Sequence, residues 1–259
     1  MRALVTGASS GIGRDIAKIL SQKGYDLVLV ARDEKKLEDV KKECEKVSKE
    51  NGESITKIQI ISMDLSVVEN CKMLHDQVKD VDLLVNNAGF GDCGEFTKTS
   101  LDKEIAMINT NIIAYHILTK LYLIDMKEKN SGKILNVASI AGFMPGPLMS
   151  TYYATKNYVV KLSEGIRQEL KKENSKVKIS VLCPGPVATN FNNVANVKFH
   201  LREAKSYDVA KYAVKKLELG KFYIVPGLDV KIIRFFSIFV PDSFLAKITY
   251  FGQRRKIYG

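Results

Sequence analysis

Cysteine and histidine are scarce in this chain of 259 residues, which contains four cysteines and three histidines. The cysteines are Cys44, Cys71, Cys93 and Cys183, and no two of them are spaced as Cys-x-x-Cys. The histidines lie far apart along the chain. Disulfide frameworks and zinc sites need clustered thiols or imidazoles, so the sequence predicts neither kind of site.

Long apolar runs and leader-like segments are also missing. No apolar run reaches the roughly 18 residues that suggest a membrane-spanning helix. Met1 is followed directly by a run typical of a strand, which leaves no room for a secretory signal peptide. We therefore expect a protein of the reducing cytoplasm. A chain of this length without a linker fits one large domain.

Acidic residues are fewer than basic ones, with 29 Asp and Glu against 40 Lys and Arg, and the formal net charge is +11. Such an excess can indicate nucleic acid, anionic lipid or a lysine-rich solvated surface. Many lysines stand beside carboxylates, as in residues 32–50, and no basic groove interspersed with aromatic residues is visible. The sequence therefore predicts no nucleic-acid partner.

Short apolar runs alternate with amphipathic segments along most of the chain. Strands are predicted at residues 1–5, 27–31, 57–63, 82–86, 133–138 and 177–183, and helices at 67–78, 101–127 and 151–172. Another helix is predicted after Ala31, with its apolar face formed by Leu37, Val40, Cys44 and Val47. With a last pair near 207–225, this alternation predicts one doubly wound α/β domain, with a parallel sheet covered by helices on both faces.

Three glycines, Gly7, Gly11 and Gly13, lie between the first predicted strand and the helix after it. Glycine lets the backbone turn sharply and approach a bound group without interference from a Cβ atom. The N–H groups of the first helical turn would then face a phosphate. An ordinary tight turn is the alternative, and this motif alone does not decide between the two.

Further motifs follow along the chain, and they are Asp64; Asn86-Asn87-Ala88-Gly89; Asn111; Ser139; Tyr152-Tyr153-Ala154-Thr155-Lys156; and Pro184-Gly185-Pro186-Val187-Ala188-Thr189. With the glycine turn, this ordered set resembles the classical short-chain dehydrogenase/reductase (SDR) family over nearly the whole chain. The resemblance implies a Rossmann-type sheet of about seven strands within residues 1–229. It also implies nicotinamide-dinucleotide contacts at Gly7, Ser9, Ser10, Gly11, Ile12, Gly13, Arg32, Asp64, Leu65, Asn87, Ala88, Gly89, Tyr152, Lys156, Pro184, Gly185, Val187 and Thr189.

The resemblance assigns four residues to catalysis, namely Asn111, Ser139, Tyr152 and Lys156. Tyr152 and Lys156 are four residues apart, which places both side chains on one face of a helix. The ammonium group is expected to lower the pKa of the phenol, whose ordinary value of about 10 makes it a poor base at neutral pH. Tyr152 would exchange a proton with the substrate, Ser139 would hold the substrate oxygen, and Lys156 would also orient the nicotinamide ribose.

Arg32 follows the second predicted strand, where dinucleotide folds meet the adenosine ribose. A guanidinium suits a 2′-phosphate, whereas an acidic side chain would accept a hydrogen bond from a free 2′-hydroxyl. We therefore favour NADP(H). NAD(H) stays open because Ser10 occupies a slot that is often basic in phosphate-preferring relatives, and because Arg32 could simply face solvent.

For two polar residues, Asp64 and Asn111, the sequence allows a structural role as well as a role in the site. The resemblance implies that Asp64 contacts the adenine amino group, but its side chain could also cap a helix that begins near Ser66. Asn111 interrupts an apolar helical run, where a buried amide must find partners. The resemblance implies that Asn111 holds a water between Lys156 and solvent. A satisfied core asparagine is the alternative.

Two segments near the C-terminus differ in composition from the rest. Residues 190–206 are polar and aperiodic with interspersed apolar side chains, which suits a lid over the substrate. Residues 230–240 are almost wholly apolar, and further apolar residues lead to a basic cluster at 254–256. This extension, residues 230–259, is expected to form a pocket wall or a subunit interface, or to lie on a membrane surface.

The sequence thus predicts an NADP(H)-dependent oxidoreductase that interconverts a carbonyl and a secondary alcohol. The loops around the proposed centre favour an apolar substrate such as a ketone, a steroid-like molecule or an acyl chain, because they contain Phe90, Phe143, Met144, Leu148 and Met149. A non-catalytic NADP(H)-binding regulator on the same fold is the alternative. The resemblance also implies a homodimer or homotetramer formed through two long helices.

Overall fold

The computed structural model describes residues 1–50, 57–191, 195 and 203–258. Its strands are β1 (Arg2–Thr6), β2 (Asp26–Ala31), β3 (Ile58–Ser62), β4 (Leu83–Asn86), β5 (Lys133–Val137), β6 (Lys178–Leu182), β7 (Val187–Ala188), β8 (Ala204–Lys205) and β9 (Tyr223–Ile224). Its α-helices are α1 (Gly11–Ser21), α2 (Glu34–Glu50), α3 (Val68–Gln77), α4 (Leu101–Ile108), α5 (Ala114–Glu128), α6 (Ser150–Lys172), α8 (Ser206–Glu218), α9 (Leu228–Ser237) and α10 (Asp242–Tyr258).

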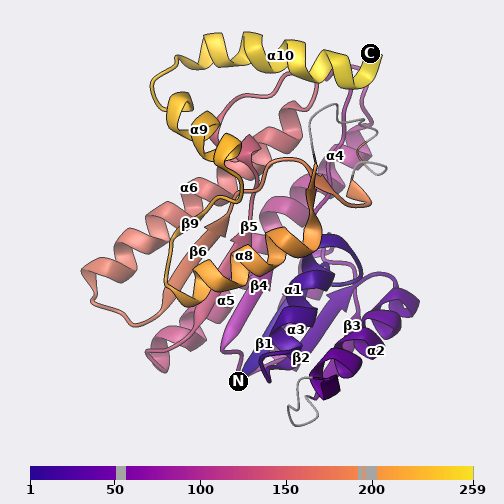
Figure 1. Cartoon of the computed structure of the whole chain (residues 1–259), viewed down its shortest axis with the longest axis vertical. Helices are drawn as coiled ribbons and strands as arrows, with labels where there is room; N and C mark the ends of the chain where they lie inside the picture. The colour runs from indigo at the N-terminus through magenta and orange to yellow at the C-terminus, as the bar shows by residue number, and fades with distance from the viewer. Residues whose placement is uncertain (51–56, 192–194, 196–202, 259) are drawn as a thin grey trace.

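A seven-stranded parallel sheet occupies the centre, with the strand order β3-β2-β1-β4-β5-β6-β9 (Figure 1). The chain begins in the middle of this sheet, because Ala3 of β1 pairs with Leu27 of β2 on one side and Leu83 of β4 on the other. Strand order reverses between β1 and β4, which is where open α/β sheets bind ligands beyond the carboxyl ends of their strands. The predicted doubly wound sheet is confirmed.

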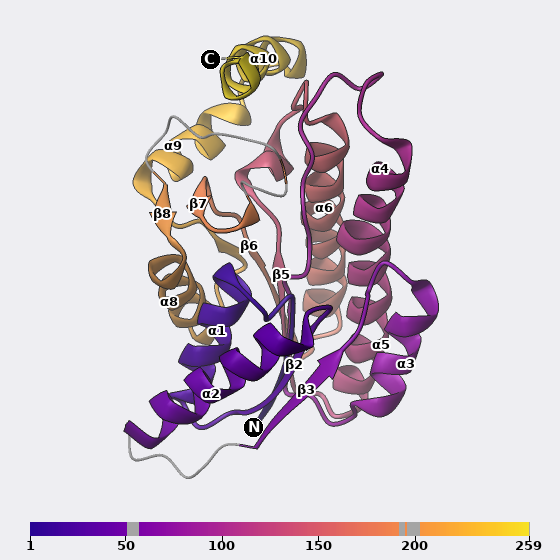
Figure 2. The ribbon, with the colours of Figure 1, turned by 90° about the vertical axis from the view of Figure 1, so that its right-hand side faces the viewer.

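Helices cover both faces of the sheet (Figures 1 and 2). On one face, α1, α2 and α8 pack over one hydrophobic cluster, and on the other face α3, α5 and α6 pack over a second. Leu4 and Val5 are neighbours in β1 but belong to different clusters, because successive strand residues point to opposite faces. Double coverage explains why the strands read as continuous apolar runs.

The helix after Ala31, α2, buries three of its four predicted apolar positions. Leu37, Val40 and Cys44 of α2 are buried, and Ser48 rather than Val47 completes the buried face. The Ser48 position lies four residues after Cys44, so it continues the same helical face. Burial at this position is therefore decided by geometry rather than by the polarity of the side chain.

The helical region predicted at residues 101–127 is confirmed, but it is not one regular α-helix. A π-helical turn, Asn109–Ile113, separates α4 from α5. The Ala114 N–H bonds to the carbonyl of Asn109, five residues earlier, instead of the usual four. Such turns are common at functional sites, and this one contains Asn111.

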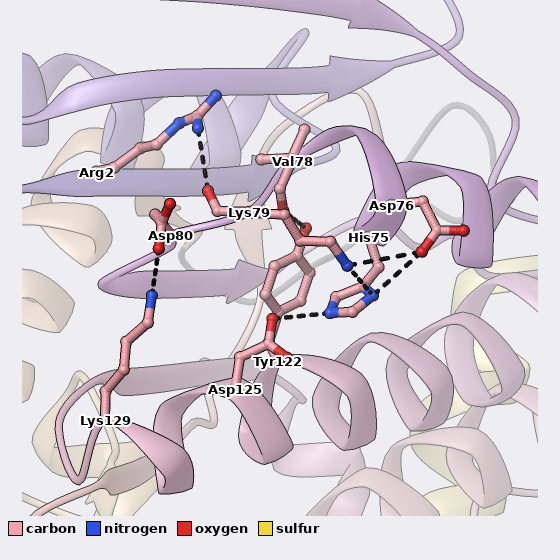
Figure 3. A network of polar contacts seen from close by, with 9 residues as sticks. All are labelled: Arg2, His75, Asp76, Val78, Lys79, Asp80, Tyr122, Asp125 and Lys129. Atoms are coloured by element: carbon pink, nitrogen blue, oxygen red, sulfur yellow. Dashed lines mark hydrogen bonds and ion pairs between the residues drawn. The ribbon is translucent and has the colours of Figure 1, made fainter.

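A polar network lies at the amino ends of the strands (Figure 3). Tyr122 of α5 donates a hydrogen bond to the carbonyl of Val78 at 2.9 Å, and Arg2 donates to the carbonyl of Lys79 at 3.0 Å. His75 contacts the carboxylate of Asp125 at 2.9 Å. These contacts hold the connection between α3 and β4 against α5, at the end of the sheet away from the carboxyl ends of the strands.

The two C-terminal helices, α9 and α10, lie together at one end of the molecule (Figures 1 and 2). Val230 of α9 joins the core cluster, and Leu245 of α10 is also buried. None of the helices in the described ranges is long and apolar enough to cross a membrane.

Candidate active site

The glycine turn connects β1 to α1 directly over the middle of the sheet. Gly7 and Gly11 have φ angles of 64° and 55°, in the left-handed region that favours glycine. A Cβ atom on Gly7 would lie 2.7 Å from the Cα of Ala88. Gly13 sits behind the turn, where a Cβ atom would lie 2.4 Å from the Gly7 carbonyl oxygen, so this glycine allows close packing of helix and strand.

Thr6 and Asn87 hold this turn against the end of β4. The Thr6 hydroxyl accepts hydrogen bonds from the backbone N–H groups of Asn87 and Ala88, at 2.9 and 3.1 Å. The Asn87 amide donates to the carbonyls of Thr6 and Gly7, at 3.0 and 3.1 Å. Two loops that are about 80 residues apart in sequence are thereby joined into one surface.

A cleft of about 1170 Å³ extends along this surface, past the carboxyl ends of the strands. Small-ligand pockets usually have volumes of about 300–1,000 Å³, so a dinucleotide and a second molecule have room here. All but two of the predicted site residues line it, and they are Gly7, Ser9, Ser10, Gly11, Ile12, Arg32, Asp64, Leu65, Asn87, Ala88, Gly89, Ser139, Tyr152, Lys156, Pro184, Gly185, Val187 and Thr189. Gly13 and Asn111 lie behind its wall.

Arg32 lies on the cleft wall just after β2, together with Asp33 and Lys36. Lys36 pairs with Asp33 at 2.9 Å, and this contact lowers the pKa of the Asp33 carboxyl group. Within the described ranges, the Arg32 guanidinium has no carboxylate partner. This end of the cleft therefore offers a free guanidinium, while the adjacent carboxylate is already engaged.

Asp64 lies on the cleft wall and does not cap a helix. Its carboxylate accepts a hydrogen bond from the Ser66 N–H at 2.9 Å, within a turn. The next helix, α3, begins only at Val68 and has Val67 at its N-cap. The alternative in which Asp64 caps a helix that begins near Ser66 is therefore wrong, because the helix begins two residues later and has a different N-cap residue.

Ser139, Tyr152 and Lys156 come together on the same wall from two elements. Ser139 follows β5, and its hydroxyl accepts a hydrogen bond from the Ala141 N–H at 3.2 Å and donates one to the Pro184 carbonyl at 3.5 Å. Tyr152 and Lys156 lie one turn apart on α6, and the Lys156 Nζ is 5.8 Å from the centre of the Tyr152 ring. The cleft thus holds a hydroxyl, a phenol and an amine side by side.

Lys156 lines the cleft but is almost completely buried. Its Nζ donates a hydrogen bond to the Val137 carbonyl at 3.0 Å and lies 5.4 Å from the centre of the Tyr115 ring. Burial lowers the pKa of this amine to about 8, because a charged group loses its hydration there.

The expected acidification of Tyr152 is not what this structure gives. Burial raises the pKa of its phenol above the ordinary value, and the hydrogen bond with Ser139 offsets part of that rise. Two features explain the difference. The Lys156 Nζ bonds to a backbone carbonyl, and the low polarity around the phenol disfavours the phenolate.

Asn111 projects from the π-helical turn and holds the loop after β4. Its amide oxygen accepts a hydrogen bond from the Phe90 N–H at 3.1 Å, and its amide nitrogen donates to the Phe90 carbonyl at 2.9 Å and to the Thr155 hydroxyl at 3.1 Å. Asn111 is completely buried. It therefore links the cleft loop to α6, as a satisfied core asparagine would.

The loop after β6 crosses the cleft beside the glycine turn. The Ile140 N–H donates to the Pro184 carbonyl at 2.9 Å, which joins this loop to the Ser139 segment. A Cβ atom on Gly11 would lie 3.0 Å from Thr189, so the two loops nearly touch. The expected lid at residues 190–206 falls largely outside the described residues, and only Asn190, Phe191, Ala195 and 203–206 belong to them.

The part of the cleft where a substrate is expected is mainly apolar. Of the loop residues expected there, Phe90, Met144 and Met149 line the cleft. Phe143 instead packs against Tyr223, with 5.7 Å between the two ring centres. The Arg234 guanidinium lies 4.9 Å from the centre of the Phe143 ring.

The C-terminal helices add cleft residues that the motifs did not identify. Ile233 of α9 and Ile248, Thr249 and Gln253 of α10 line the wall. Gln253 is 2% exposed, its amide nitrogen donates to the Tyr153 hydroxyl at 2.5 Å, and its amide oxygen is buried without a partner in the described residues. The only sequence signal for this wall was the apolar character of the tail, which did not distinguish a wall from an interface.

The family model of the short chain dehydrogenases matches residues 1–198. A human protein named dehydrogenase/reductase SDR family member 11 is 33% identical over 213 residues, which cover 81% of this chain and 82% of the relative. The ketoacyl reductase HetN of Nostoc sp. is 35% identical over 189 residues, which cover 71% of this chain and 63% of the relative.

Solved structures show the same similarity. A short-chain dehydrogenase from Sphingobium yanoikuyae in complex with NADPH has a TM-score of 0.79 and 26% identity, over 88% of both chains. A short-chain dehydrogenase/reductase from Burkholderia phymatum in complex with NAD has a TM-score of 0.78 and 25% identity, over 90% of this chain and 91% of that chain. These neighbours support a nicotinamide cofactor without deciding between the two forms.

Proposed function

Because the chain belongs to the short-chain dehydrogenase family, whose members are oxidoreductases that act on CH–OH groups with NAD(P), we propose that it interconverts a carbonyl and a secondary alcohol with NADP(H). One observation carries the proposal. Ser139, Tyr152 and Lys156 line one cleft that is large enough for a dinucleotide and a substrate, and the Lys156 Nζ lies one helical turn from Tyr152, 5.8 Å from the centre of its ring.

Tyr152 is the proposed general acid and base. A bound nicotinamide would supply or accept the hydride at the substrate carbon. In reduction, Tyr152 donates its phenolic proton to the carbonyl oxygen, and in oxidation it takes the proton back. The raised pKa of the phenol keeps it protonated at neutral pH, which suits the donating role in reduction. Ser139 donates a hydrogen bond to the same substrate oxygen and holds it beside Tyr152.

Lys156 would place a positive charge near the phenol and donate hydrogen bonds to the cofactor ribose. Its pKa of about 8 leaves the amine mostly protonated at neutral pH. Asn111 would act behind these groups as a positioning residue, because it joins the Phe90 loop to Thr155 on the helix that carries Tyr152 and Lys156.

The preference for NADP(H) is supported by the free guanidinium of Arg32. Arginine can bind a phosphate with two parallel hydrogen bonds, and Lys36 lies on the same wall. The pairing of Asp33 with Lys36 makes this carboxylate a poorer acceptor for a ribose hydroxyl. The glycine turn and the N-terminus of α1 would hold the bridging phosphates.

An apolar substrate is supported by the side chains that surround the reactive groups. Phe90, Met144, Met149, Ile233 and Ile248 line this part of the cleft. A ketone on an acyl chain or a steroid-like ring system fits such a lining, because burial of its apolar surface favours binding.

The test is NADPH oxidation by the purified protein against ketones and aldehydes of increasing chain length. Tyr152→Phe should lower kcat by about 10²–10⁴-fold, the usual contribution of a general acid, and should still bind NADPH. Tyr153→Phe is the matched control, because it removes the neighbouring phenol and should keep most of the turnover. If NADPH binds but no compound is reduced by the wild type, the non-catalytic regulator is the better proposal.

A further inference from the structure

An apolar stripe runs along the outer face of α9. Leu228, Ile232, Phe235 and Phe239 recur at intervals of four, three and four residues, which places them on one helical face. Between 56% and 76% of each of these side chains is exposed. Exposed apolar side chains scattered singly are ordinary, but an aligned set of this size marks a binding surface.

A second stripe runs along α10 and has the same spacing. Phe244, Ile248 and Phe251 are separated by four and three residues, and 54–62% of each side chain is exposed. Because both helices lie at one end of the molecule (Figure 2), the stripes of α9 and α10 together form what we call the terminal apolar surface. It adds seven aligned apolar side chains to this end of the protein.

Neither stripe is needed to attach its helix to the domain. On α9, Val230 is buried, and the Arg234 guanidinium lies 3.5 Å from the centre of the Tyr223 ring. On α10, Thr249 donates a hydrogen bond to the Pro145 carbonyl at 2.9 Å, and Gln253 bonds to Tyr153. These contacts involve other faces of the helices, so the stripe residues stay largely exposed, and of these seven only Ile248 also lines the cleft.

The charge of this segment indicates what covers the surface. Residues 228–258 contain six basic residues against two acidic ones, Asp229 and Asp242. Lys231, Lys247 and Arg254 are exposed. A second copy of this surface would bring like charges together, whereas anionic lipid head groups would complement them.

We propose that α9 and α10 dock on an anionic membrane surface through the terminal apolar surface. Helices with apolar residues on one side and basic residues beside them lie in the plane of the membrane interface. This inference goes beyond the proposed reaction and does not depend on turnover.

Docking would also place the cleft beside the bilayer. Ile233 of α9 and Ile248 of α10 line the cleft, and Ile248 belongs to the outer stripe as well. An apolar molecule dissolved in the membrane could then reach the cleft without crossing water, which matches the apolar lining of the substrate side.

The experiment is vesicle flotation of the full chain with phosphatidylcholine vesicles, with and without phosphatidylglycerol. The wild type should float with the anionic vesicles, and added salt should weaken its binding because salt screens the basic residues. The quadruple variant Phe235→Ser, Phe239→Ser, Phe244→Ser, Phe251→Ser should lose about tenfold or more of its vesicle affinity. NADPH binding and circular dichroism verify that this variant folds.

Phe96→Ser is the matched control, because Phe96 is 66% exposed and lies outside the C-terminal helices. It should float like the wild type. The double variant Lys231→Glu, Lys247→Glu should bind the anionic vesicles less tightly than the wild type does. Its binding to vesicles of phosphatidylcholine only should not change. The proposal is overturned if the wild type does not float, or if Phe96→Ser loses as much binding as the quadruple variant. It is also overturned if the quadruple variant floats normally but dissociates a dimer, since the surface would then be a subunit interface.

Discussion

Lys156 is a buried cation of the cleft wall, and we propose that the chemistry of the cleft depends on it. Its pKa of about 8 means that the folded protein binds this proton less tightly than the unfolded chain, where the ordinary value is about 10.5. Between these two pH values the unfolded chain carries more protons. The contribution of Lys156 to stability therefore rises with pH across this window.

Lys156→Met should reveal this dependence in the free energy of unfolding. The difference between the pKa of about 8 in the folded protein and about 10.5 in the unfolded chain corresponds to about 3 kcal/mol. Between about pH 7 and pH 10, the free energy of unfolding of the wild type should therefore rise by about 2–3 kcal/mol relative to that of the variant. Urea denaturation of both proteins across this range measures the difference. Lys161→Met, which changes an exposed lysine of the same helix, should show no such trend. A pH-independent difference for Lys156→Met would contradict the lowered pKa.

Arg32 is the residue on which we propose that the choice of cofactor depends. Arg32→Asp should raise the KM for NADPH by about 10–100-fold, because a charge-assisted hydrogen bond contributes about 1.5–3 kcal/mol. The KM for NADH should change much less. Steady-state kinetics with both cofactors measure this shift, and Lys35→Asp is the control because Lys35 is exposed and absent from the described cleft wall. An unchanged preference would reject the assignment of Arg32.

At the scale of elements, the contact between α1 and the end of β1 leaves no space for a side chain. A Cβ atom on Gly13 would lie 2.4 Å from both the Gly7 carbonyl oxygen and the Asn87 amide nitrogen. The backbone oxygen cannot move away without displacing the whole turn. Close packing of this helix on the sheet is therefore part of the construction of the cleft.

Gly13→Ala should lower the free energy of unfolding by about 1–3 kcal/mol or more and weaken NADPH binding, because the added methyl group overpacks this contact. Gly165→Ala is the matched change in α6, where a Cβ atom would meet nothing within 4 Å. It should raise stability by about 0.5–1 kcal/mol, because alanine is the better helix former. Chemical denaturation measures the free energy of unfolding of both variants, which should fall for Gly13→Ala and rise for Gly165→Ala. Equal changes in the two variants would contradict the packing argument.

The π-helical turn is the element that gives Asn111 its position. It separates α4 from α5 at the point where Phe90 and Thr155 both meet the Asn111 amide. In an uninterrupted α-helix, the Asn111 side chain would point in a different direction around the helix axis, because the π-helical turn contains more residues per turn. The irregular turn thus joins the cleft loop to the helix of Tyr152.

At the scale of the whole molecule, a second set of exposed apolar side chains lies on α4, α5 and α6. It contains Leu101, Ile105 and Ile108 of α4, Ile124 of α5 and Tyr158 of α6, which are 36–69% exposed. This region contains the long helices through which we expect a homodimer or homotetramer.

Leu101→Ser with Ile105→Ser should shift the protein to a smaller species, because the substitutions remove apolar area from this expected interface. Sedimentation equilibrium measures the mass. Leu219→Ser is the control, since Leu219 is 60% exposed at the end of α8. A wild type that sediments as a monomer would contradict the expected assembly.

Much of the architecture could be predicted from the sequence because its signals are local. The alternation of apolar runs and amphipathic segments defines strands and helices, and the order of motifs such as Gly7 to Gly13 and Tyr152 to Lys156 places the reactive groups at the carboxyl ends of the strands. The four-residue spacing on α6 depends only on helical geometry.

Tertiary structure decided the features that depend on residues far apart in the chain. Gln253 meets Tyr153 across 100 residues, so the tail became a wall of the cleft only when the chain folded. The direction of the pKa shift of Tyr152 likewise depends on burial, which outweighs the lowering effect of Ser139 on this pKa. Local periodicity determines what each segment becomes, whereas desolvation and long-range contacts are properties of the assembled fold.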